Sequence, residues 1–190
     1  MRKDNKKLRR MAAGSLAAVM LLGSVLAAGF TDTDGHWAKS YIDSLSAKGM
    51  IQGYEDGSFR PEGQVTYLET LTFVSRLYSL EGVPTDTIVK KWQPVIEDAM
   101  KGSATWSYTN LALCLEAGVL TQAELRELTA EGQINGAASR EDLAVCLTRA
   151  MQLAPVAATL RTYSLTFPDA AKISKDAMAS VYLLNKIGVI

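Results

Sequence analysis

The sequence predicts an all-α protein built from tandem helix-loop-helix repeats, and three observations support this prediction. Apolar residues recur at helical spacing in three segments that align without a gap, residues 37–51, 106–120 and 176–190. The segments lie about 70 residues apart, and a regular period is typical of repeat architectures. Two of them are followed by the signature of a capped second helix. We therefore expect similar helical hairpins that pack on one another.

The first 28 residues have the three parts of an export signal. A basic start, MRKDNKKLRR, precedes an apolar run, and Val25 and Ala27 offer small residues for cleavage after Ala27 or Ala28. The alternative is an uncleaved membrane anchor, because the uncharged run from Met11 to Thr31 is long enough to span a bilayer of ~30 Å. In both cases the rest of the chain is expected outside the cytoplasm.

The charge is unevenly placed along the chain. Of 20 basic and 20 acidic residues, six basic and one acidic residue precede residue 28, which leaves 14 basic and 19 acidic residues. The remainder is therefore acidic, with a net charge of −5, and we predict no nucleic-acid partner, since such a surface needs a basic patch.

Each aligned segment predicts a first helix of about three turns. The segments share a glycine just past the last periodic residue: Gly49, Gly118 and Gly188. Because glycine adopts the left-handed conformation without steric cost, we expect each to end its helix as a C-cap. Two apolar residues follow each glycine and are expected to return to a buried contact.

Copies one and two continue into a second helix. Thr66 is followed three residues later by Glu69, and Ser139 by Asp142, so each pair predicts a capping box. We interpret these four residues as structural caps. An apolar stripe follows each box, formed by Leu68, Leu71, Val74 and Leu77 in copy one and by Leu143, Cys146, Leu147 and Ala150 in copy two.

The copies differ after the first helix. Copy two has a further capping box, Thr121 to Glu124, which predicts a short helix in place of the loop of copy one. Copy three has neither loop nor second helix, so we expect a longer protein or a partner that completes the fold. The predicted divisions are an export signal (1–28), repeat one (29–81), a linker with a short helix from Pro94 (82–104), a divergent repeat two (105–154) and the N-terminal part of repeat three (163–190).

The loop GYEDGSFRPEGQVTYLE, residues 53–69, connects the two helices of copy one. Gly53 and the Asp56-Gly57 pair predict turns. Tyr54 and Phe59 are expected to tether these turns to the helical body.

No residue pattern indicates catalysis or a cofactor. The lone histidine, His36, is expected to pack or cap beside Trp37, because a metal site needs further ligands. The stretch DTDGHWAKSYID fails as a calcium loop, since its glycine falls at position 4 rather than 6. Cys114 and Cys146 are compatible with a disulfide or with two reduced core thiols. We predict no cofactor and no enzymatic activity.

Residues 30–69 resemble the S-layer homology module. The matching positions include the Phe30/Asp32 pair, His36-Trp37-Ala38, Gly49 and the Gly53-Tyr54-x-Asp56-Gly57-x-Phe59-x-Pro61 loop. The resemblance implies three such modules around a pseudo-threefold axis, the second divergent and the third incomplete. It further implies a cell-surface location in the cell wall or S-layer, through pyruvylated secondary cell-wall polysaccharide on peptidoglycan.

The resemblance also implies the binding residues, in grooves between modules. The family's arginine at the start of the second helix is Arg140 in copy two, where a guanidinium can clamp a pyruvyl carboxylate; the alternative is a solvated surface arginine. Copy one has Tyr67 there, which cannot neutralise a carboxylate. Trp37 and Trp106 are interpreted first as core wedges between modules and alternatively as sugar platforms. Loop neighbours complete the implied site, namely Asp32 and Tyr54.

Two functions follow as hypotheses. The first is a non-catalytic anchoring module that binds secondary cell-wall polymer, with a C-terminal passenger domain as a further expectation. The second is a secreted helical scaffold for protein–protein assembly whose sugar grooves have degenerated, favoured by Tyr67 and by the rebuilt loop of copy two.

Overall fold

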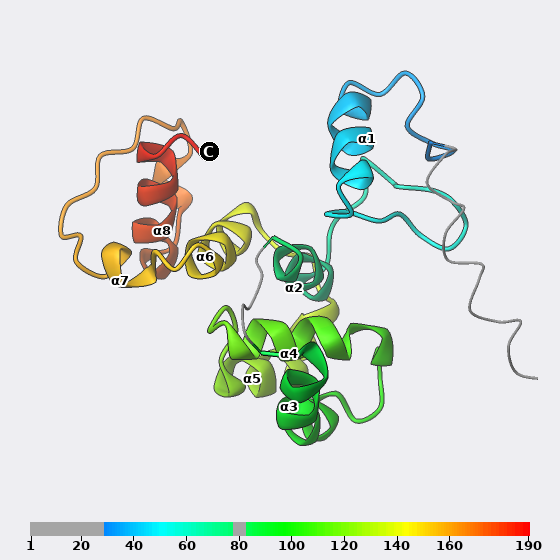
Figure 1. Ribbon diagram of the computed structural model, residues 1–190. Coiled ribbons are helices and arrows are strands. Elements are labelled where there is room, and N and C mark those ends of the chain that lie inside the picture. The colour runs from blue at the N-terminus through cyan, green and yellow to red at the C-terminus, as the bar shows by residue number, and fades with distance from the viewer. Residues whose placement is uncertain (1–28, 78–82) are drawn as a thin grey trace, which may run out of the picture. The chain divides into compact units, whose positions relative to one another are not determined.

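Figure 1 shows a computed structural model of the chain, which describes residues 29–77 and 83–190. Within these ranges the protein is helical and has no strand, apart from an isolated bridge between Thr66 and Ala137. The all-α prediction is confirmed. No helix in these ranges is long and apolar enough to cross a membrane. The predicted export signal (1–28) and the predicted end of repeat one at residue 81 lie outside the described residues.

The chain forms two compact units that divide between Pro61 and Glu62. This division falls inside predicted repeat one. The first helix and the loop of that repeat belong to unit 1, whereas its second helix belongs to unit 2.

Within its described residues, 29–61, unit 1 contains one helix, α1 (Lys39–Ala47), and the loop that follows it. Ile42, on the inner side of α1, is 5% exposed. The rings of Phe30 and Phe59 pack with centroids 5.1 Å apart, which joins the two ends of the unit. Phe59 is thus tethered to the segment that precedes α1, and its expected contact with the helical body stays a prediction.

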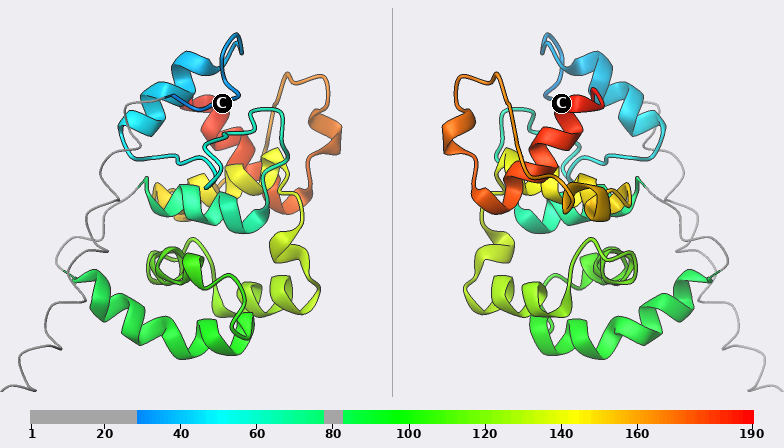
Figure 2. Two further views of the ribbon diagram at one scale, coloured as in Figure 1. Left: turned by 90° about the vertical axis from the view of Figure 1, so that its right-hand side faces the viewer. Right: turned by 90° about the vertical axis from the view of Figure 1, so that its left-hand side faces the viewer.

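Unit 2 contains the remaining elements. They are α2 (Tyr67–Ser75), α3 (Thr85–Met100), η2 (Thr105–Ser107), α4 (Tyr108–Glu116), α5 (Gln122–Ala130), η3 (Gln133–Asn135), α6 (Arg140–Ala150), α7 (Ala154–Ala157), η4 (Ala170–Lys172) and α8 (Lys175–Lys186). Helix α4 lies between α2 and α3 (Figure 2), and α6 packs against both α2 and α8. The helix predicted in place of the copy-two loop is α5, so that prediction is confirmed.

A main core fills the space between α2, α3, α4 and α5. Its members are almost inaccessible to solvent, for example Leu71, Leu111 and Leu125, each 0% exposed. A smaller cluster joins α6 to α8 through Ala144, Val181 and neighbouring side chains. The apolar stripes that predicted the helices therefore supply core residues, except that Leu77 lies beyond the end of α2 and is 36% exposed.

Helix α3 corrects the prediction of a linker with a short helix from Pro94. The helix begins at Thr85 and runs for 16 residues with Pro94 inside it. Ile88, Ile96 and Met100 on its inner side are buried in the main core. Burial of this apolar stripe offsets the cost of an internal proline, so tertiary packing overrides the local helix-breaking signal.

The predicted helix ends are confirmed in all three copies. Gly49, Gly118 and Gly188 have φ of +69°, +71° and +75°. In each copy the residue after the glycine donates its N–H to the carbonyl five residues earlier, at 2.9–3.0 Å. This hydrogen bond is the Schellman pattern. The capping boxes of α2, α5 and α6 are also present with both reciprocal hydrogen bonds.

Candidate functional site

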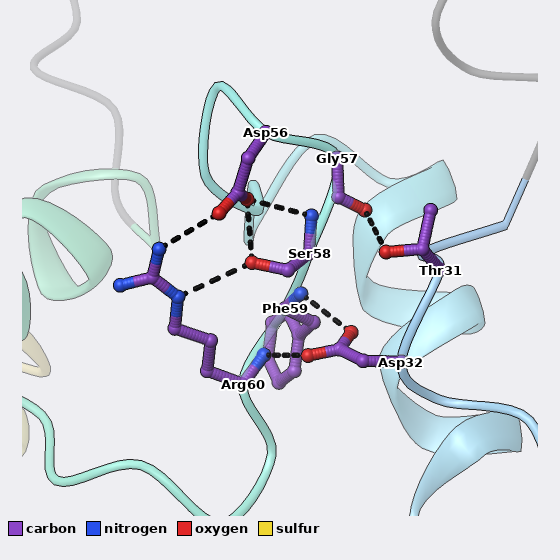
Figure 3. A network of polar contacts seen from close by, with 7 residues as sticks. All are labelled: Thr31, Asp32, Asp56, Gly57, Ser58, Phe59 and Arg60. Carbon is purple, nitrogen blue, oxygen red and sulfur yellow. Dashed lines mark hydrogen bonds and ion pairs between the residues drawn. The ribbon is translucent and has the colours of Figure 1, made fainter.

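The loop of unit 1 is organised by Asp32. Its Oδ1 accepts a hydrogen bond from the Phe59 N–H at 2.8 Å and its Oδ2 accepts one from the Arg60 N–H at 2.7 Å (Figure 3). These bonds, the one from Phe59 foremost, lower the pKa of the carboxyl below its usual value. Both oxygens of Asp32 thus hold the loop backbone.

Arg60 forms the centre of this loop. Its Nη2 donates to Asp56 Oδ2 at 2.8 Å and its Nε to Ser58 Oγ at 3.2 Å (Figure 3). The guanidinium carbon lies 4.0 Å from the centroid of the Tyr54 ring, a cation–π contact. Tyr54 therefore stacks on Arg60, and its expected role as a tether to the helical body stays a prediction. Hydrogen bonds from Ser58 and then from Arg60 lower the pKa of Asp56 to about 2.

The turns of the loop are those predicted. The Gly57 N–H donates to the Tyr54 carbonyl at 2.9 Å, and Gly57 has φ of +81°. At Gly53 a Cβ atom would overlap the Ser58 carbonyl and the Phe30 ring, so this position requires glycine for close approach rather than for its dihedral angles.

Two aromatic side chains on unit 1 face solvent. Trp37, which precedes α1, is 80% exposed, and Tyr41, in α1, is 67% exposed. His36 accepts a hydrogen bond on Nδ1 from the Ala38 N–H at 3.1 Å and packs against Trp37, which confirms its expected capping role.

In unit 2 the structure brings the starts of α2 and α6 together. The Tyr67 N–H donates to the Gly136 carbonyl at 3.0 Å, and the Ala138 N–H donates to the Val65 carbonyl at 2.8 Å. Tyr67 is the first residue of α2, and Arg140 is the first residue of α6. The two residues hold equivalent positions in their repeats, and each lies next to one of the two segments that these hydrogen bonds join.

Tyr67 lines an acidic depression of about 590 Å³ in unit 2. Four of its lining residues carry carboxyl groups, namely Glu124, Glu127, Asp142 and Asp176. Burial, together with neighbouring Cys146 and nearby carboxylates, raises the pKa of the Tyr67 phenol, so it remains a neutral hydrogen-bonding group. The charge of the depression disfavours an anionic ligand.

Arg140 and Trp106 are both on the surface. Arg140 is exposed and makes no hydrogen bond or ion pair with any residue that the structure describes. Trp106, in η2, is 60% exposed. Neither Trp106 nor Trp37 fills the core of its own unit, and the interpretation of these tryptophans as wedges between modules stays a prediction.

Arg149 is a structural residue whose role the sequence did not reveal. Its guanidinium binds both oxygens of Glu124, at 2.8 and 3.1 Å, and donates to the Val119 carbonyl at 3.0 Å. Burial opposes ionisation of Glu124, but Arg149 and Thr121 outweigh it and the pKa of Glu124 is lowered. The partner of Arg149 could not be read from the sequence, because Glu124 lies 25 residues earlier in the chain.

The two cysteines are buried free thiols, as one of the two alternatives predicted. Burial raises the pKa of Cys146 to about 11. No group of His, Cys, Asp and Glu side chains within residues 29–77 and 83–190 is arranged to hold a metal ion.

The predicted binding residues thus divide between the units. Asp32, Trp37 and Tyr54 lie in unit 1, and Tyr67, Trp106 and Arg140 lie in unit 2. Arg60, which no pattern singled out as a contact, has its side chain 52% exposed at the loop surface.

Comparison with known families identifies one stretch of the chain. Residues 29–71 match the S-layer homology domain, from the first described residue into α2. This stretch is similar to that domain and includes the Asp32-centred loop and the capping box of α2.

Known proteins are similar to the chain over part of its length. A cellulosome-anchoring protein of Acetivibrio thermocellus is 36% identical over 81 residues, which cover 43% of this chain and 16% of that protein. An S-layer protein of Bacillus anthracis is 30% identical over 135 residues, 68% of this chain and 15% of that protein. An outer membrane protein of Thermus thermophilus is 40% identical over 73 residues, 38% of this chain and 8% of that protein. The matched region therefore spans a small part of each relative.

Proposed function

We propose that this protein is a non-catalytic anchoring module of the cell surface that binds secondary cell-wall polysaccharide on peptidoglycan. The match of residues 29–71 to the S-layer homology domain carries this proposal. The names of the relatives, a cellulosome-anchoring protein and S-layer proteins, support the anchoring role and the surface location.

The chemistry of Arg140 supports a pyruvylated polymer as the ligand. The side chain is exposed at the first turn of α6, and no described residue pairs with it. A free guanidinium can donate two parallel hydrogen bonds to the carboxylate of a pyruvyl ketal. In this proposal the exposed Trp106 and Trp37 offer flat faces for sugar rings.

Binding to purified cell walls tests the anchoring role. The exported chain should co-sediment with native wall sacculi and not with sacculi stripped of secondary polymer. Arg140→Ala should weaken binding about tenfold, the effect of losing a charge-assisted contact of about 1.5 kcal/mol. Arg126→Ala is the matched control, because Arg126 is another exposed arginine of unit 2. Equal binding by Arg140→Ala and the wild type would rule out the carboxylate contact.

The acidic depression beside Tyr67 favours a second candidate, a helical scaffold for protein–protein assembly. Four carboxylates at the position where the family arginine is missing would repel an anionic polymer. A folded chain that sediments with neither wall preparation, and that instead self-associates in analytical ultracentrifugation, would support this scaffold.

A further inference from the structure

The backbone of Arg60 is held in a conformation that favours glycine. Its φ is +59°, in the left-handed region, where a Cβ atom is strained. The two hydrogen bonds from the loop N–H groups to Asp32 hold this conformation in place. Strained residues fixed by their surroundings concentrate at functional sites, so the side chain at this position needs an explanation.

The side chain of Arg60 is oriented with one edge left open. Nε and Nη2 are bound to Ser58 and Asp56, and one face of the guanidinium lies on Tyr54. The remaining terminal nitrogen points away from the other residues drawn in Figure 3 and donates to no described residue. These contacts therefore hold the N–H donors on the outer edge of the Arg60 guanidinium in a fixed direction.

The charges around Arg60 determine which ligand suits this edge. Asp56 neutralises the guanidinium at 2.8 Å, and Asp32 adds a second negative charge beside the loop. The cluster thus has no net positive charge to attract a carboxylate. Uncharged oxygen atoms can still accept hydrogen bonds from the open edge.

We propose that Arg60 is a sugar contact whose outer edge donates hydrogen bonds to neighbouring hydroxyl oxygens of an uncharged pyranose. This inference rests on the proposed function. It places a ligand contact in unit 1, within the repeat in which Tyr67 stands at the position of the family arginine. Asp32, Asp56 and Tyr54 are positioning residues that fix the guanidinium. The carboxylate of a pyruvylated sugar is left to Arg140.

Arg60→Gly separates binding from folding. Glycine adopts a φ of +59° without strain, so the variant should keep the thermal stability of the chain while losing the donors. Arg60→Lys is a second variant that keeps the charge but not the planar fork. Lys101→Gly is the matched control, because Lys101 is an exposed cation with φ of +48° outside the site.

The measurement is co-sedimentation of the full exported chain with native sacculi and with sacculi whose pyruvyl ketals have been removed by mild acid. Arg60→Gly and Arg60→Lys should bind both preparations about five- to tenfold more weakly than the wild type, the effect of losing hydrogen bonds to uncharged hydroxyl oxygens. Lys101→Gly should bind as the wild type does. Unchanged binding by Arg60→Gly would overturn the proposal. A loss of binding to native sacculi alone would also overturn it, because such a loss would show that Arg60 contacts the pyruvyl carboxylate. If the wild type binds neither preparation, the anchoring function itself fails and the sugar contact with it.

Discussion

At the scale of single residues, much of the loop of unit 1 depends on carboxylates that accept backbone hydrogen bonds. Asp32 binds two N–H groups across 27 and 28 residues of sequence, and Asp56 binds the Ser58 N–H and hydroxyl. Sequence reasoning placed Asp32 among ligand contacts because the resemblance implied it. The structure gives it a structural role in the loop, which the sequence could not show because the acceptor and donors are far apart along the chain.

The lowered pKa of Asp56 predicts that the loop loosens in acid. The pKa is about 2 in the folded loop and 3.8 for an ordinary aspartate, so the ionised form is favoured by folding. This contribution is fully present above about pH 4 and is lost as the pH falls through about 2. We expect the NMR signal of the Ser58 amide to shift over this window. Asp56→Asn should remove that transition, and a midpoint near pH 4 in the wild type would contradict the prediction.

The ion pair between Arg149 and Glu124 predicts a cost when one partner is removed. Arg149→Ala leaves a partly buried carboxylate and removes the donor to the Val119 carbonyl, so we expect unit 2 to lose roughly 2 kcal/mol of stability. That figure is below the range for fully buried pairs, because both side chains keep about a third of their surface exposed.

Urea unfolding measures the effect of Arg149→Ala, and Arg126→Ala provides the comparison. Arg126 lies 3.8 Å from Asp98 and both side chains are mostly exposed, so its removal should change stability by less than about 0.5 kcal/mol. Equal effects of the two variants would mean that the Arg149 ion pair contributes no more than a surface contact.

At the scale of elements, helix ends were the part of the fold that local sequence predicted best. A capping box or a C-cap glycine acts within a few residues, so Thr66, Ser139 and Gly118 identified their helix ends correctly. Helix α3 was missed because its stability comes from packing on α4 and α5, and Pro94 is a local signal against it.

Helix α3 predicts that Pro94 is destabilising. Proline has no N–H for the carbonyl one turn earlier, and this residue is exposed, so it contributes little packing in return. Pro94→Ala should stabilise unit 2 by about 2 kcal/mol in urea unfolding. Lys90→Ala, on an exposed position of the same helix, should remain within about 0.5 kcal/mol of the wild type. A Pro94→Ala variant no more stable than the wild type would show that the helix is already kinked without cost.

At the scale of the whole molecule, the sequence repeats do not coincide with the compact units of the structure. Copy one divides at Pro61, and its second helix joins the core formed with α4 and α6. Sequence similarity to the S-layer homology domain rests on one short segment, Phe30 to Glu69, because the glycines and aromatics of the loop are closely spaced. It could not place Arg60, whose role follows from a left-handed backbone and from partners that only the folded loop brings together.

The most direct test of the anchoring function is co-sedimentation of the exported chain with native sacculi and with sacculi stripped of secondary polymer. Polymer recognition predicts binding to native sacculi only, with the bound fraction reduced about tenfold by Arg140→Ala. Equal binding to both preparations, or to neither by a folded chain, would contradict polymer anchoring.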